Sequence, residues 1–105
     1  MFILVLAAGV LACPFPIDRS TTISTRADLP AAVVRSFGDI AEKGQPFQVS
    51  DALPPGPHPP FSRFVSAQAR GCELELHYEH GGRGHGWQTA HFHFESGHWV
   101  MISRR

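Results

Sequence analysis

Two neighbouring segments near the C-terminus, residues 72–79 and 87–95, alternate apolar residues with histidine and glutamate. His91 and His93 are separated by one residue, a spacing that places both imidazoles on one face of a β-strand. Imidazole pairs of this kind suit Zn²⁺ or Cu²⁺. The pattern predicts a metal site whose ligands come from both segments: Glu75, His77, His91 and His93.

The same side chains also fit a solvated sheet face. Glutamate and histidine would then pair across strands, each pair contributing a few tenths of a kcal/mol. The chain has seven histidines, and imidazoles gain charge below about pH 6. A metal-binding or pH-responsive protein is therefore the alternative function that the sequence predicts.

The glycine-rich stretch between these segments is the leading candidate for function. This stretch covers residues 80–86 and is followed directly by a tryptophan. We expect it to form a hairpin loop. Aromatic and arginine side chains are favoured anchors at protein interfaces. We expect a partner-binding surface made of His80, Arg83, His85 and Trp87. The competing interpretation is a mobile loop, with Trp87 covering the sheet edge.

Size and charge exclude several function classes. After a leader and irregular segments are removed, roughly 70 residues remain, too few to build a deep water-excluding active site easily. Cys72 falls on the apolar side of its segment, away from the histidines, so it fits a buried residue better than a nucleophile. The chain has nine basic and nine acidic residues, without the basic excess of a nucleic-acid binder. We expect neither an enzyme nor a nucleic-acid-binding protein.

The N-terminus begins with an uncharged apolar run, residues 2–12, that ends at Cys13. Eleven residues are too short to span a bilayer and suit the core of a secretory signal peptide. Val-Leu-Ala-Cys at residues 10–13 resembles the lipobox of bacterial lipoproteins. That resemblance implies a signal peptide over 1–13, lipidation at Cys13, and a periplasmic or membrane-anchored protein whose partner is another envelope protein. If Cys13 is not acylated, a Cys13–Cys72 disulfide is the alternative in an oxidising compartment.

The remaining pattern predicts one small α+β domain over residues 28–105, preceded by a Pro/Ser/Thr-rich tether over 14–27. An amphipathic helix is expected over about 28–43, and a short strand near Phe47 and Val49. The apolar face of the helix, which should pack against the apolar sides of the strands, is made of Leu29, Val33, Phe37, Ile40 and Ala41. A curved antiparallel meander of about four strands follows, over 62–70, 72–79, 87–95 and 98–103. A helix packed on such a meander resembles cystatin-like folds in architecture.

A hairpin centred on Arg83 sets the register of the two central strands. It would place Glu75 opposite His91 and Glu73 opposite His93, with the cross-strand Cβ atoms about 5 Å apart.

Overall fold

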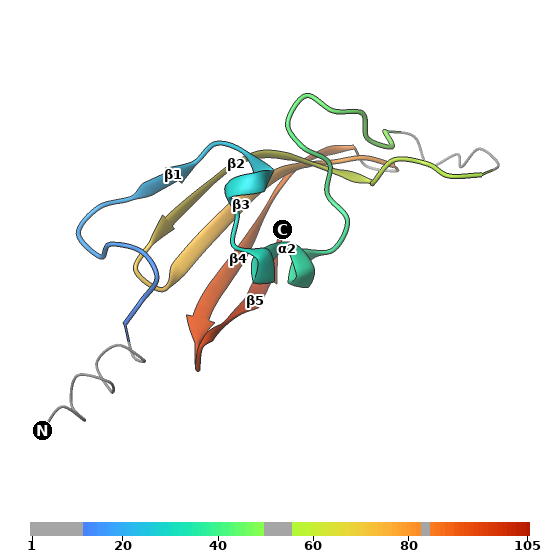
Figure 1. Ribbon diagram of the computed structural model, residues 1–105. Helices are drawn as coiled ribbons and strands as arrows, with labels where there is room; N and C mark the ends of the chain where they lie inside the picture. Colours follow the sequence, from blue (N-terminus) through green and yellow to red (C-terminus); the bar gives the residue numbers. More distant parts are fainter. Residues whose placement is uncertain (1–11, 50–55, 83–84) are drawn as a thin grey trace, which may run out of the picture.

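A single antiparallel sheet runs through the protein, with short helices on one of its faces (Figure 1). The computed structural model describes residues 12–49, 56–82 and 85–105. The strands lie side by side in chain order: β1 (Thr21–Ile23), β2 (Ser62–Arg70), β3 (Glu73–His80), β4 (Gly86–Glu95) and β5 (His98–Arg104). The predicted α+β class is confirmed, but the sheet has five strands and not four.

The additional strand, β1, lies in the segment that was expected to be a tether. It pairs antiparallel with β2, placing Ile23 opposite Ala67 in the buried layer. Phe15 also packs against the core, and its backbone N–H donates to the carbonyl of Gly71. The low apolar content of residues 14–27 concealed this strand, because a three-residue edge strand needs only one buried side chain to attach it.

The predicted helix over 28–43 is too long. A 3₁₀ turn, η1 (Arg26–Asp28), precedes the helix α2 (Ala31–Phe37). Gly38 ends the helix at φ +102°, a conformation that a helical residue cannot adopt. Beyond it, Ala41 forms an isolated parallel bridge to Arg63 of β2.

The apolar residues assigned to that long helix are nonetheless all buried. Their exposed fractions are 8% or less: Leu29, Val33, Phe37, Ile40 and Ala41. Leu29, Ile40 and Ala41 reach the core from non-helical backbone. Helical spacing therefore identified the core residues correctly, while the backbone that delivers them differs.

Two irregularities change which face of the sheet a residue occupies. The β2–β3 register shifts between Phe64 and Ser66, and the β4–β5 register shifts between His91 and Phe92. In β5 the extra residue is Ile102, which is 58% exposed. Each bulge lets residues of opposite parity enter the same core.

The core fills the space between the sheet and the helices. The fully buried side chains come mainly from the sheet: Phe64, Leu74, Leu76, Tyr78 and Phe92, with Val33 from α2. Trp99 is 7% exposed and lies edge-on to Phe94. The sequence expectation that the apolar sides of β3 and β4 face the helix is confirmed.

A disulfide joins Cys13 to Cys72, with the two Cα atoms 4.8 Å apart. It attaches the N-terminal segment to the turn between β2 and β3. A sulfur in this bond has no free valence for a lipid thioether, so the disulfide and lipidation at Cys13 exclude each other. Of these two alternatives, the structure contains the disulfide.

The N-terminal targeting prediction falls largely on residues 1–11, which lie outside the described part of the chain. In the ranges that the structure describes, no helix is long and apolar enough to cross a membrane.

The segment around Phe47 and Val49 is not a strand, contrary to expectation. It runs instead across the base of the β3–β4 hairpin. The N–H of Gln48 donates to the carbonyl of Pro60, and the N–H of Gly82 donates to the carbonyl of Val49. Residues 47–49 therefore brace the end of the sheet where the glycine-rich loop begins.

Candidate functional site

The glutamates of β3 form a row on the sheet face that the helices leave open. Glu73, Glu75 and Glu79 alternate along the strand with buried residues that face the core. On β4, His91 and His93 lie on the same open face, opposite Glu75 and Glu73 as the hairpin register predicted. The predicted register is confirmed, and it brings imidazoles and carboxylates together across β3 and β4.

Glu73 holds both histidines of β4. Its Oε1 lies 2.7 Å from Nε2 of His91, and its Oε2 binds Nδ1 of His93. All three side chains are between about one third and one half exposed. One carboxylate thus accepts from two imidazoles on the open face of the sheet.

These contacts set the acidity of Glu73. Partial burial acts to raise the pKa of its carboxyl, but the hydrogen bonds from His93 and His91 outweigh it and lower the pKa from 4.5. The two histidines therefore favour the ionised form of Glu73. Glu73 was not among the predicted site residues, although the predicted register already placed it opposite His93.

Three of the four predicted metal ligands, Glu75, His77 and His91, line one depression on the open face. Their imidazoles, however, have other hydrogen-bond partners. Nδ1 of His77 lies 3.0 Å from Thr89 Oγ1 and its Nε2 lies 3.8 Å from Glu75 Oε1, while His91 and His93 both bind Glu73. In the three described ranges, no group of three or more histidines, cysteines or acidic residues is placed to hold a metal ion.

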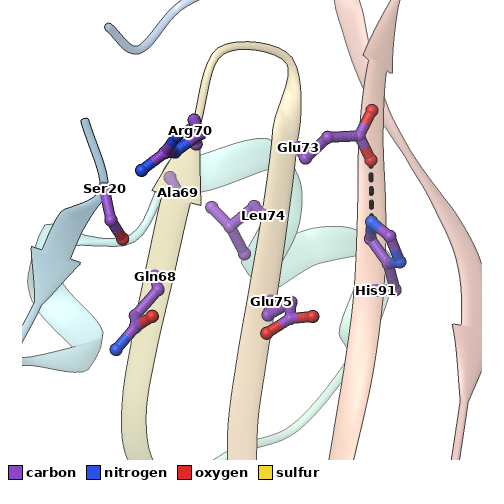
Figure 2. A pocket seen from close by; sticks show the side chains of 8 residues that line it. All are labelled: Ser20, Gln68, Ala69, Arg70, Glu73, Leu74, Glu75 and His91. Carbon is purple, nitrogen blue, oxygen red and sulfur yellow. Dashed lines mark hydrogen bonds and ion pairs between the residues drawn. The ribbon is translucent and has the colours of Figure 1, made fainter. Parts of the chain in front are cut away.

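A depression of about 230 Å³ lies on the open face over β2 and β3 (Figure 2). Its polar lining comes from four strands or their ends: Ser20, Gln68, Arg70, Glu73, Glu75 and His91. A second depression, of about 260 Å³, adjoins it and shares Glu75 and His91. This half of the face therefore offers both hydrogen-bond donors and acceptors to a small polar ligand.

The predicted partner-binding residues lie at the opposite end of the sheet. His80 ends β3 and pairs with Gly86, while Arg83 falls outside the described residues. His85 and Trp87 stand together, with ring centroids 5.7 Å apart. Trp87 is 71% exposed.

A chain of polar contacts supports this aromatic pair. Arg63 Nη2 donates to Glu79 Oε1 at 2.8 Å, and His85 Nε2 lies 3.0 Å from Glu79 Oε2. The Arg63 guanidinium also stacks on the ring of Phe47, 4.3 Å from its centroid. The contacts link β2, β3, the hairpin and the bracing segment, so that Trp87 projects from an ordered base.

Glu79 is the centre of that base. Hydrogen bonds from Arg63 and then from His85 lower the pKa of its carboxyl from 4.5, despite partial burial. Neither Arg63 nor Glu79 was predicted as a functional residue. Alternation placed Glu79 on the open face, but only the bulged register of β2 shows that Arg63 lies opposite it.

The chain was compared with protein-family models, with curated proteins and with solved structures, and none of the three comparisons found a match.

Proposed function

We propose that this chain is an exported, non-catalytic protein of the bacterial envelope that acts by binding another envelope protein. The contact region is the docking surface, defined here as Val49, His85 and Trp87 at the hairpin end of the sheet. The observation that carries the proposal is Trp87, a large aromatic side chain that is 71% exposed. Tryptophan is among the residues that most often dominate binding energy at interfaces.

The support beneath Trp87 favours binding over a loose surface residue. His85 packs beside it and is itself held by Glu79, whose other oxygen binds Arg63. A side chain that is already ordered loses less conformational entropy when it binds. The docking surface is thus arranged before any partner arrives.

A second exposed apolar residue lies at the same end of the sheet. Val49 is 51% exposed, and its carbonyl accepts from Gly82 of the hairpin. His85 also contacts the ring of Phe47, with centroids 6.0 Å apart, so the hairpin and the bracing segment form one surface. An apolar patch rimmed by histidine and a paired arginine suits a protein partner.

The disulfide supports export. Disulfide bonds form and persist in oxidising compartments such as the periplasm, and are rare in reducing ones. The Cys13–Cys72 bond therefore agrees with the apolar leader. In this proposal Cys13 serves as a covalent attachment within the domain and not as a lipid anchor.

Site-specific photo-crosslinking in the producing cell tests the docking surface. A photoreactive residue replaces Val49, which is 51% exposed on the docking surface, in one variant and Ile102, which is 58% exposed on β5, in the matched control. Trp87 is kept in both variants. We expect one discrete crosslinked protein from position 49 and none from position 102. Equal crosslinking from both positions, or none from position 49, would contradict the proposal.

A second variant separates binding from folding. Trp87→Ala removes an exposed side chain, so the free energy of unfolding should change by no more than about 0.5 kcal/mol. Binding to the crosslinked partner should weaken at least tenfold, since interface anchors contribute about 2 kcal/mol or more. A partner that binds this variant at full strength would place the interface elsewhere.

A second candidate function is pH response on the open face, favoured by the simultaneous contacts of Glu73 with His91 and His93. Protonation of both imidazoles would add positive charge beside one carboxylate and change the charge of the whole face. Carboxyl-carbon NMR of Glu73 across this protonation, in the unmodified protein and in the double variant His91→Ala with His93→Ala, tests it. If the pH profile of Glu73 is the same in both proteins, this candidate is wrong.

A further inference from the structure

We propose that the depression over β2 and β3 is a binding site for a small zwitterion, a ligand that carries both an ammonium group and a carboxylate, such as an amino acid or a short peptide. The site lies on the open face in the half of the sheet away from Trp87, so it is independent of the docking surface. The depression has a volume of about 230 Å³ (Figure 2). Six polar residues line it: Ser20, Gln68, Arg70, Glu73, Glu75 and His91.

One side of the depression presents hydrogen-bond donors. Arg70 and Gln68 project from β2 toward the β1 side, where Ser20 lies (Figure 2). All three are exposed, and among the described residues their side chains make no hydrogen bond or ion pair. A guanidinium, an amide and a hydroxyl with free donors together form a cradle for a carboxylate.

The other side presents a carboxylate that is free to accept. Glu73 and Glu75 both project from β3, but Glu73 is directed to β4 and is occupied by its two histidines. Within the described parts of the chain, the one charged group near the Glu75 carboxylate is His77, at 3.8 Å, and Glu75 is 53% exposed. Glu75 is therefore the acceptor for a ligand ammonium group.

The strand spacing matches a short dipolar ligand. Gln68 lies directly opposite Glu75 in the β2–β3 pair, and Arg70 lies opposite Glu73. Neighbouring strands are about 4.8 Å apart, and diagonal residues on one face are about 7–8 Å apart. A ligand that bridges Arg70 and Glu75 needs opposite charges separated by a few bonds, as in an amino acid or peptide.

Charge balance excludes a ligand of one sign. An anion near Arg70 would be repelled by Glu75 and Glu73, and a cation near Glu75 would be repelled by Arg70. A ligand with both charges satisfies each group by a charge-assisted hydrogen bond.

Titration of the full chain with triglycine, followed by isothermal titration calorimetry and by NMR, tests the site. Three analogues separate the charges: triglycine, which has both; N-acetyltriglycine, which has only the carboxylate; and triglycine amide, which has only the ammonium group. We expect triglycine to bind with a Kd of about 1 mM, the affinity expected for a ligand of its size. Amide signals near Ser20, Gln68 and Glu75 should shift, and each singly charged analogue should bind at least tenfold more weakly.

Variants confirm the location. Arg70→Gln and Glu75→Gln should each weaken triglycine binding roughly 10-fold to 100-fold, the effect of losing one charge-assisted hydrogen bond. The matched controls, Arg35→Gln on α2 and Glu95→Gln at the end of β4, change the same charges elsewhere and should leave the Kd unchanged. All four side chains are exposed, so circular dichroism should show an intact fold.

Two results would overturn the proposal. If N-acetyltriglycine or triglycine amide binds as tightly as triglycine, the site recognises one charge only. If none of the three shifts the amides around the depression, it is a solvated surface.

Discussion

Gly81 lies against the backbone carbonyl of Gln48, and a Cβ on Gly81 would overlap that oxygen. The contact joins the start of the glycine-rich loop to residues 47–49. Next to this contact, the N–H of Gly81 donates to the backbone carbonyl of Phe61, and the N–H of Gly82 donates to the backbone carbonyl of Val49. The absence of a side chain at residue 81 is what allows the hairpin end and the bracing segment to meet.

Gly81→Ala should therefore separate these segments. The methyl group displaces the carbonyl of Gln48, and overpacking of this kind costs about 1–3 kcal/mol of unfolding free energy. Hydrogen exchange of the Gly82 amide, which donates to Val49 at 2.9 Å, should speed up more than exchange in the core of the sheet.

Gly97→Ala is the control for that prediction. Gly97 has a φ of +82° in the turn between β4 and β5, and a Cβ there would meet no atom within 4 Å. This variant should lose about 1 kcal/mol from backbone strain alone. Its Gly82 amide should exchange as in the unmodified protein; faster exchange there would mean that general destabilisation explains both variants.

Loss of the disulfide should remove most of the stability. The bond closes a loop with a sequence separation of 59 residues, and the chain-entropy relation gives about 4 kcal/mol for a loop of this size. Domains this small have only about 3–5 kcal/mol in total. Urea unfolding of the full chain, with and without reductant, should show a large fall in the midpoint.

The variant Cys13→Ser with Cys72→Ser should be equally unstable and insensitive to reductant. Intact mass of the purified protein gives an independent check, because the disulfide removes two hydrogens while lipidation adds a diacylglyceryl group. A stable double variant, or a lipid adduct on Cys13, would show that the bond does not hold the domain together.

Acid should destabilise the protein partly through Glu79. Because its pKa in the folded protein is lower than 4.5, the unfolded chain binds more protons between these two values. This contribution to stability is complete above about pH 4.5 and is lost as the pH falls through the folded pKa. Unfolding free energies measured from pH 6 down to pH 3 should show the loss.

Arg63→Gln should flatten that acid dependence. Arg63 provides the largest of the effects that lower the pKa of Glu79, so the pKa should return toward 4.5. A carboxyl-carbon NMR titration measures it directly, with Arg35→Gln as the charge-matched control. An unchanged Glu79 pKa in the Arg63 variant would contradict the assigned ion pair.

Glu73 should respond to its histidines in the same way. His93→Ala and His91→Ala each remove a hydrogen bond that lowers the pKa of Glu73, and the double variant should raise that pKa above its value in the unmodified protein. His98→Ala is the control, because the His98 ring forms its hydrogen bond with the carbonyl of Ser96 and none with Glu73. A Glu73 pKa that moves equally in all these variants would argue against the specific pairing.

Local pattern predicted the central hairpin well. Alternation assigned the faces of β3 and β4, and a loop centred on Arg83 set Glu75 opposite His91. This succeeds because side chains in a strand alternate strictly and a hairpin loop fixes the register of the strands that it joins. The Glu73 cluster follows from the same register, although it was not identified as a site.

The sequence pattern predicted the wrong secondary structure where tertiary contacts override local preference. Ile40 and Ala41 continue a helical spacing, but Gly38 ends the helix and Ala41 bridges to Arg63. β1 also exists only because β2 is available to pair with it. Neither interaction can be inferred from nearby residues, since the partners are at least 20 positions apart.

The sequence by itself determined most of the buried residues between Leu29 and Phe92, the polar face of the sheet and the hairpin register, because these depend on the period of an element and on one short loop. Only the tertiary structure decided which polar groups meet outside that hairpin. It paired Glu79 with Arg63, joined Cys13 to Cys72, and left Arg70 and Glu75 beside a common depression. Those outcomes depend on a bulge in β2 and on contacts between distant segments, where a shift of one residue moves a side chain to the opposite face.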